Sequence, residues 1–254
     1  MSSSTYSGFT YGHTVTEANR YIDFDEGSGE LTGLIAVGSY TLGDYIGAVA
    51  TALNNAGTQE YAVSLDRTTR TLTITAGASF DLLVTTGTNV SLSAYPLMGY
   101  TVNQSGTSLE GDSASGSLYE PQGPLQRYVD FADNVRTTNG IVRETATGRV
   151  EVVSYSTVEF MECNITPITN RELQGGSFKN DPQALENFRE FMRYCITKAP
   201  IELILDLDTP TTFRSCLLES TRESGDGLNF KSKEWFQRKV IDYYQSGTLT
   251  FRGL

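Results

Sequence analysis

The chain has 254 residues, and its 30 acidic against 19 basic side chains give it a formal charge of −11. Such acidity disfavours broad nucleic-acid binding, which needs a densely basic surface. The sequence has no run of about 20 apolar residues, so we expect no membrane insertion. The N-terminal stretch lacks the basic and apolar regions of a signal peptide, and an aromatic content of 11% indicates a folded chain.

The charge is unevenly distributed along the chain. Residues 1–118 carry 3 basic and 11 acidic side chains, for a net charge of −8, and the remainder of the chain carries −3. The segment that joins the two parts is rich in Ser and Gly and poor in apolar residues, which is typical of a linker. We therefore predict an N-terminal domain over 1–103, a Gly/Ser-rich linker over 104–124 and a C-terminal domain over 125–254.

The first domain begins, in chain order, with two strands and a helix. Residues 18–25 end in an apolar/polar alternation, a Gly-containing turn follows, and 31–37 is predicted to return as a second strand. Residues 38–57 have apolar positions at helical spacing. Thr41 is the predicted N-cap of this helix, and the run Asn54–Gly57 is its predicted stop.

A hairpin and two short elements complete this domain. Residues 60–66 and 71–75 both alternate and are joined by a polar turn, which predicts a β-hairpin. A further strand is predicted at 80–84 and a short helix at 88–94. The order of strands around one helix indicates a small α+β domain.

Three motifs of this domain occur together in a recognisable order. They are Gly-Ser-Tyr-Thr at 38–41, a hairpin with Tyr-Ala-Val at 61–63 and Arg-Thr-Leu-Thr-Ile at 70–74, and a closing Leu-Met-Gly-Tyr at 97–100. Over about residues 20–103 the chain resembles a module of tailed-bacteriophage structural proteins. Those modules end in a Leu-Gly-aromatic motif, and here Met98 intervenes. The resemblance implies a protein of the virion.

The second half reads as strands, one helix and further strands. The clearest helix in the chain is predicted over 180–198, with Asp181 as N-cap, Pro182 in the first turn and Pro200 as the stop. Strands are predicted before and after this helix, at 127–132, 141–146, 149–155, 156–165, 201–207, 213–219, 235–244 and 248–252.

This order of elements, carried by residues 140–165, 182–208 and 243–254, resembles the split-barrel fold of phage tail-tube, distal-tail and minor tail proteins. The resemblance covers roughly residues 125–254. We therefore expect an α+β, mostly β chain. A small α+β N-terminal domain is followed in this prediction by a split β-barrel or sandwich with one amphipathic helix.

Histidine and cysteine offer little for catalysis or metal binding. The chain has one histidine, His13, so a His-based triad or zinc site would have to be built on it alone. We interpret it as a surface or disordered side chain. Cys163, Cys195 and Cys216 form no C-x-x-C pair, which favours reduced thiols, and Cys195 falls on the apolar face of the predicted helix.

Two acidic groups are candidates for a binding or catalytic site. Asp23, Asp25, Glu26 and Glu30 could bind calcium, but their spacing differs from that of an EF-hand loop, so we interpret them as a solvated turn. Asp206 and Asp208 could form a glycosidase-like pair, but a strand-terminal Asp beside Thr-Pro favours turn chemistry. The sequence Gly111-Asp-Ser113 lacks the second glycine of a hydrolase nucleophile elbow.

One basic cluster stands out in the acidic chain. Lys231, Lys233, Arg238 and Lys239 surround Trp235. We interpret this cluster as a solvated face or a contact with an acidic neighbouring subunit, with DNA in a channel as the alternative.

These observations predict no catalytic, cofactor-binding or metal-binding residues and no enzyme activity. The resemblance implies a structural component of a phage tail, a distal-tail or baseplate ring protein, a tube protein or a minor tail protein. Such a protein assembles in the host cytoplasm and ends in the virion. Its implied partners are further copies in a ring, with a hexamer as one candidate, other tail proteins, and DNA that passes without specific binding.

The alternative function is an adhesion module at the tail tip that binds a receptor or a carbohydrate. The 14 Tyr and Trp235 could stack on sugars. Aromatic residues in two cores and at subunit interfaces explain the same composition, so this hypothesis ranks second.

Overall fold

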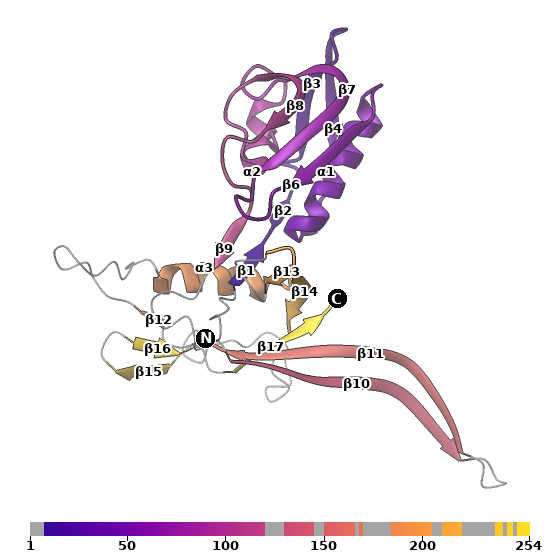
Figure 1. Ribbon diagram of the computed structural model, residues 1–254, viewed down its shortest axis with the longest axis vertical. Helices are drawn as coiled ribbons and strands as arrows, with labels where there is room; N and C mark the ends of the chain where they lie inside the picture. Colours follow the sequence, from indigo (N-terminus) through magenta and orange to yellow (C-terminus); the bar gives the residue numbers. More distant parts are fainter. Residues whose placement is uncertain are drawn as a thin grey trace, which may run out of the picture. The chain divides into compact units, whose positions relative to one another are not determined.

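The computed structural model describes residues 8–119, 130–144, 150–165, 168–169, 184–204, 210–219, 237–240, 243–245 and 248–254, and Figure 1 labels its elements. The chain divides into two compact units. The N-terminal unit consists of residues 8–119 and 199–213. The C-terminal unit consists of residues 1–7, 120–198 and 214–254.

The main sheet of the N-terminal unit has five antiparallel strands. They lie in the order β4-β3-β7-β6, and β8 adds to β7. Their bounds are β3 Tyr21–Asp25, β4 Glu30–Leu34, β6 Tyr61–Leu65, β7 Leu72–Leu82 and β8 Gln104–Glu110. Both predicted hairpins are confirmed by the pairing of β3 with β4 and of β6 with β7. The separate strand expected at 80–84 is instead the end of the long strand β7.

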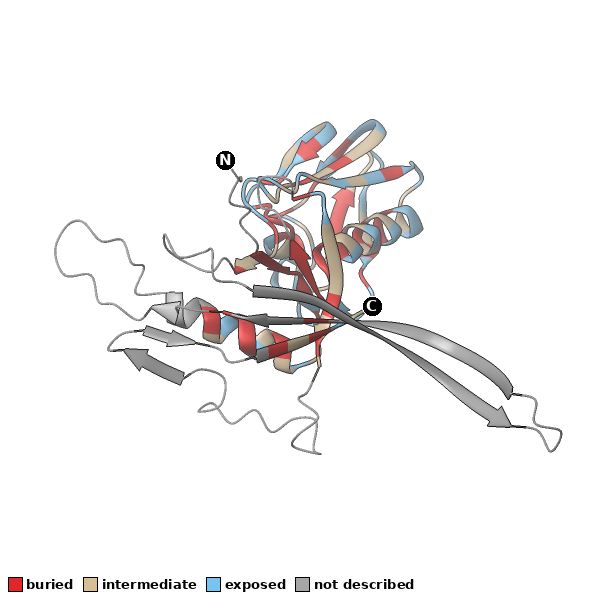
Figure 2. Cartoon of the chain, turned by 60° about the horizontal axis from the view of Figure 1, so that its bottom comes forward, coloured by how far each residue is buried: buried red, intermediate tan, exposed pale blue. Residues whose placement is uncertain are grey.

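Helix α1 (Leu42–Ala56) contacts β4 and β6 and confirms the helix predicted over 38–57, except that Gly38–Tyr40 form strand β5. Thr41 is the N-cap, because its Oγ1 accepts a hydrogen bond from the Asp44 N–H at 3.0 Å. One face of α1 is buried, as the colouring in Figure 2 shows. The buried residues are Leu42, Tyr45, Val49, Ala52 and Leu53.

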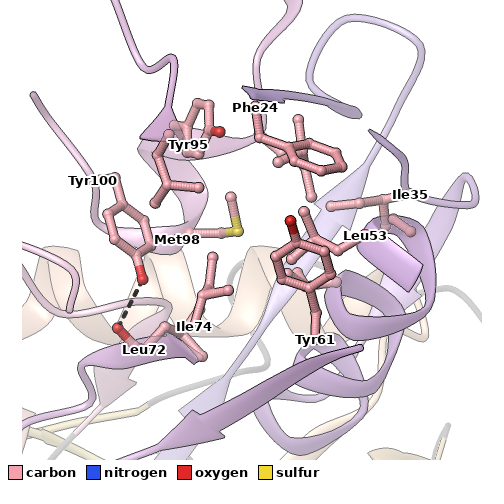
Figure 3. Packing of buried hydrophobic residues seen from close by; sticks show 14 of the residues in the cluster. Phe24, Ile35, Leu53, Tyr61, Leu72, Ile74, Tyr95, Met98 and Tyr100 are labelled. Atoms are coloured by element: carbon pink, nitrogen blue, oxygen red, sulfur yellow. Dashed lines mark hydrogen bonds between the residues drawn. The ribbon is translucent and has the colours of Figure 1, made fainter. Parts of the chain in front are cut away.

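The core of this unit lies between α1 and the sheet and closes under a second short helix, α2 (Tyr95–Met98) (Figure 3). Met98, at the end of α2, is fully buried. The short helix expected at 88–94 is a single 3₁₀ turn, η1 (Val90–Leu92). The Tyr100 hydroxyl donates to the carbonyl of Leu72 at 3.2 Å, which satisfies this polar group inside the apolar cluster.

Two further groups of paired strands complete the N-terminal unit. Strand β2 (His13–Val15) pairs with β5, and β1 (Gly8–Tyr11) lies between β9 (Ser117–Tyr119) and β13 (Ile201–Ile204). All four residues of β1 and of β13 are buried. The segment 199–213 therefore folds as part of the N-terminal unit although it was assigned to the C-terminal domain.

The predicted linker over 104–124 differs from the structure wherever its residues are described. Residues 104–110 form β8, and 117–119 form β9. Leu109, Ser115 and Tyr119 are buried. The composition misled because backbone pairing, which needs no apolar side chain, holds most of this segment in place.

The C-terminal unit contains an order of strands β10-β11-β17-β14 and a small sheet β12-β16-β15. The four predicted strands over 127–165 are instead two long ones that pair with each other. Bulges in their register, between Asp133 and Arg136 and between Asn139 and Gly140, lie where a gap was expected between the predicted strands 127–132 and 141–146. The bounds are β10 Asp130–Glu144, β11 Val150–Asn164, β12 Ile168–Thr169, β14 Phe213–Leu218, β15 Gln237–Val240, β16 Tyr243–Gln245 and β17 Thr248–Gly253.

Helix α3 (Ala184–Ile196) confirms the central helix of the second half. Its described side chains Phe188, Phe191, Met192 and Cys195 are fully buried, as the apolar stripe predicted. The proposed cap at Asp181 and Pro182 lies outside the described residues.

The chain is α+β and mostly β, as predicted. The sheets of the described residues are open, so the split barrel expected for 125–254 stays a prediction. Among the residues that the structure describes, no helix is long and apolar enough to cross a membrane.

Candidate functional site

The turn between β3 and β4 is exposed over residues 27–30, and its acidic side chains also accept hydrogen bonds. Asp25 accepts hydrogen bonds from the backbone N–H groups of Gly27 at 2.7 Å and Gly29 at 3.0 Å. Glu26 accepts bonds from the Thr58 N–H at 3.0 Å and from the Tyr61 hydroxyl at 2.9 Å. Burial opposes ionisation of Glu26, but these bonds outweigh it and lower its pKa. Glu26 therefore joins this turn to the end of α1.

The two other acids of the group bind the loop after β7. Asp23 is buried and accepts bonds from the Asn89 backbone N–H at 2.6 Å and from Thr32 Oγ1 at 2.8 Å. Glu30 accepts a bond from the Thr88 N–H at 2.7 Å. The four carboxylates thus face different donors and do not converge. Over the described residues, no group of three or more His, Cys, Asp or Glu side chains is placed to hold a metal ion.

The same pattern extends through the N-terminal unit. Asp66 caps the turn between β6 and β7, and Asp112 accepts the Thr101 N–H at 2.8 Å. Backbone hydrogen bonds lower the pKa of both. The carboxylates that accept hydrogen bonds within this unit are Glu17, Asp23, Asp25, Glu26, Glu30, Asp44, Asp66, Asp81, Glu110, Asp112 and Glu202. Much of the acidity of this unit therefore positions its loops.

His13 is buried, so its assignment as a surface or disordered side chain is wrong. The ring is 9% exposed, and its Nε2 lies 2.9 Å from Ser115 Oγ. It also meets the Tyr45 ring edge-on, at 4.6 Å between centroids. Ser115 is fully buried and donates its own proton to the carbonyl of Leu97 at 2.8 Å. The pair therefore lacks the free hydroxyl proton and the access that a nucleophilic serine needs.

A buried carboxylate on β13 forms an ion pair that the sequence analysis did not predict. Glu202 is fully buried and 2.6 Å from the guanidinium of Arg67. Its other oxygen accepts the Gly43 N–H at 2.8 Å, in the first turn of α1. Arg67 also lies over the Phe213 ring, 3.7 Å from its centroid. The signal in the sequence was a lone charge inside the apolar run Ile201–Leu205.

The remaining candidate residues are placed as follows. Cys195 and Cys216 are reduced, as predicted, and both are buried. Ser113 binds the carbonyl of Gly99 through its backbone N–H at 3.0 Å and has a structural role in this loop. The other candidates lie, at least in their side chains, outside the described residues: Cys163, Asp206, Asp208, Lys231, Lys233, Trp235, Arg238 and Lys239.

The tyrosines of the N-terminal unit lie mostly in its core. Tyr45, Tyr95 and Tyr100 are among its largest fully buried side chains, and Tyr61 is 3% exposed. Tyr61 packs edge-on against Phe80 at 5.1 Å. These rings serve packing, which reduces the aromatic surface that this unit could offer to a sugar.

Neither a scan against protein-family models nor a search of curated proteins gives a match to this chain.

Proposed function

We propose that this chain is a structural component of a phage tail, a distal-tail or baseplate ring protein or a minor tail protein. It acts without catalysis, by self-assembly and contact with neighbouring tail proteins. The motifs at 38–41, 61–74 and 97–100 and the order of elements over 125–254 support the proposal. The observation that carries it is the long ribbon of β10 and β11.

This ribbon is longer than the sheet that supports it (Figure 1). Strand β17 pairs with β11 only through Phe160–Asn164. Beyond that point Arg136–Glu144 and Val150–Glu159 pair with each other, and no third strand joins them among the described residues. An isolated two-stranded ribbon is marginally stable in water, and its open edges favour pairing with another chain. The ribbon is therefore suited to an intermolecular contact.

The polar groups of the N-terminal unit are consistent with a scaffold. Most of its described carboxylates accept hydrogen bonds from backbone or side-chain donors of the same unit, and His13 and Glu202 are buried among intramolecular partners. The buried tyrosines favour the assembly function over the adhesion alternative.

Particles of the phage that encodes this chain provide the decisive test. We expect mass spectrometry of purified virions to detect the chain at a copy number comparable with other tail proteins. Electron microscopy should place it in a ring or a tail-tip complex. A chain absent from virions, or present only in infected cells, would contradict the proposal. Binding to a glycan array by the monomer would instead support adhesion.

The ribbon can be tested in the purified chain. Ile141 and Val153 stand opposite each other in the register, and so do Arg143 and Glu151. Replacing Ile141 and Val153 by Asp places like charges opposite each other, which destabilises the distal ribbon. We expect mass photometry to show that this variant no longer assembles. The charge-swapped control Arg143→Glu/Glu151→Arg keeps opposite charges paired and should assemble as the wild type does. Unchanged assembly of the Asp/Asp variant would exclude the ribbon as the contact.

A further inference from the structure

The segment Gly111–Tyr119, here named the strap, is tied to the N-terminal unit through backbone and side-chain contacts. Its Gly111 and Ser115 N–H groups donate to Leu72 and Arg70 carbonyls at 2.8 and 2.7 Å. Its last three residues are β9, which pairs with β1. The middle of the strap is held from inside, because the fully buried Ser115 hydroxyl contacts His13.

The protons of this contact can be assigned from geometry. Ser115 has one hydroxyl proton, and it points to the carbonyl of Leu97 at 2.8 Å. The serine oxygen must therefore accept from His13, so Nε2 carries the proton of a neutral ring. No hydrogen-bond acceptor for Nδ1 is found among the described residues. A second proton would thus place a positive charge on a ring that is only 9% exposed.

Among the described residues, no carboxylate forms a hydrogen bond with this ring, whose printed contacts are Ser115 and Tyr45. Strand β5 and helix α1 present Tyr40 and Tyr45, and burial raises the pKa of the Tyr45 hydroxyl so that it stays neutral. The nearest acids on α1 and on the strap are bound elsewhere, Asp44 to Thr41 and Asp112 to Thr101.

The charged group closest to the strap at this point is a cation. The Arg70 guanidinium donates to the carbonyl of Gly116, next to Ser115, at 3.3 Å.

We propose that His13 is an acid-sensitive latch. The neutral ring holds the strap closed, and protonation releases the strap so that water can solvate the imidazolium. Opening separates β9 from β1 and uncovers one edge of β1, a strand whose four residues are buried when the latch is closed. The device is independent of the function proposed above and would make this end of the N-terminal unit respond to mild acid.

Burial lowers the pKa of His13 from 6.5 to about 4. When the strap is open, the His13 ring has its ordinary pKa. At a pH between the two pKa values, opening is therefore accompanied by the uptake of a proton by His13. Opening therefore becomes easier as the pH falls through this window. From pH 7 to pH 5 the opening equilibrium is expected to rise about twentyfold. At pH 5 carboxylates with lowered pKa, such as that of Asp112, are still ionised.

Hydrogen exchange of the full chain, followed by mass spectrometry and corrected for intrinsic rates, tests the latch. We expect strap amides to lose protection by about twentyfold from pH 7 to pH 5, while α1 amides do not. A nuclear magnetic resonance titration of the only histidine gives the pKa of His13 in the same sample. Equal strap protection at both pH values, or a His13 pKa near 6.5, would overturn the proposal.

Two variants identify the sensor. His13→Gln keeps a hydrogen-bond donor without a titratable ring, so its strap should be equally protected at pH 7 and pH 5. Asp112→Asn removes the strap carboxylate and should keep the wild-type pH response. A response that survives in His13→Gln or disappears in Asp112→Asn would assign the effect to another group. If His13→Gln does not fold, the pKa titration of His13 and the hydrogen exchange of the wild-type chain still test the latch.

Discussion

At the scale of single residues, this chain uses buried charge as a structural tie. Glu202 lies 159 residues from Gly43 and 135 from Arg67, and it contacts both. A fully buried carboxylate is costly unless several donors satisfy it, and here a guanidinium, a helix N–H and the Thr10 hydroxyl do so. The tie therefore depends on every one of these partners being present.

Removing the charge of Glu202 should weaken the fold markedly. We expect Glu202→Gln to lower the free energy of unfolding by about 3 kcal/mol, because the mostly buried Arg67 loses its counter-charge. Urea denaturation followed by circular dichroism measures this. The control Glu60→Gln alters an exposed glutamate and should stay within about 0.5 kcal/mol of the wild type. A Glu202→Gln variant as stable as this control would show that the ion pair contributes nothing.

The lowered pKa of Glu26 makes stability depend on acid. The unfolded state binds more protons than the folded state in this range, so stability is full above the unfolded pKa of about 4.3 and falls as the pH drops through the folded value. We expect Glu26→Gln to flatten this part of the profile. Denaturation at pH 5, 4 and 3 measures the slope. An unchanged slope in Glu26→Gln, equal to that of Glu60→Gln, would contradict the assignment.

At the scale of elements, the ends of α1 and α2 show how local chemistry sets boundaries. Thr41 caps α1, and Gly99 ends α2 in the left-handed region, at φ +83°. A Cβ at Gly99 would also meet the carbonyl of Ser113, whereas a Cβ at Gly47, inside α1, would have no neighbour within 4 Å. The two glycines occur for different reasons.

The same substitution should therefore have opposite effects at these two positions. Gly47→Ala is expected to stabilise the chain by about 0.5–1 kcal/mol, because alanine restricts the unfolded chain and favours the helix. Gly99→Ala is expected to destabilise it by about 2 kcal/mol or more, through its positive φ and the contact with Ser113. Thermal and chemical denaturation of both variants measure the change in stability relative to the wild type. Effects of equal sign would show that the turn at Gly99 can rearrange freely.

At the scale of the whole molecule, the N-terminal unit is discontinuous in sequence. Strand β13 completes the sheet around β1, with Phe9 opposite Leu203, and both are fully buried. A boundary near residue 124 therefore cuts the unit off from one of its own strands. The unit closes only after the chain has returned at residue 199.

A fragment of residues 1–124 should accordingly be unstable. Without 199–213 it exposes Phe9 and leaves Arg67 and the Gly43 N–H without their acceptor, so we expect a broadened or low-temperature unfolding transition. Joining residues 199–213 to the fragment through a flexible Gly/Ser segment should restore a cooperative transition. Calorimetry compares the two. A fragment 1–124 that unfolds as cooperatively as the joined chain would contradict this division.

The elements that arise from local interactions could be predicted from the sequence. The Thr41 cap, the apolar stripes of α1 and α3, and the alternation of β6 and β7 depend on residues a few positions apart, and each was predicted. The burial of His13, the pairing of β1 with β13 and the contacts of Glu202 join residues about 100 to 190 positions apart. These long-range contacts are visible only in the folded chain, because the patterns at 8–15 and 201–204 contain no information about which distant surface each will bury.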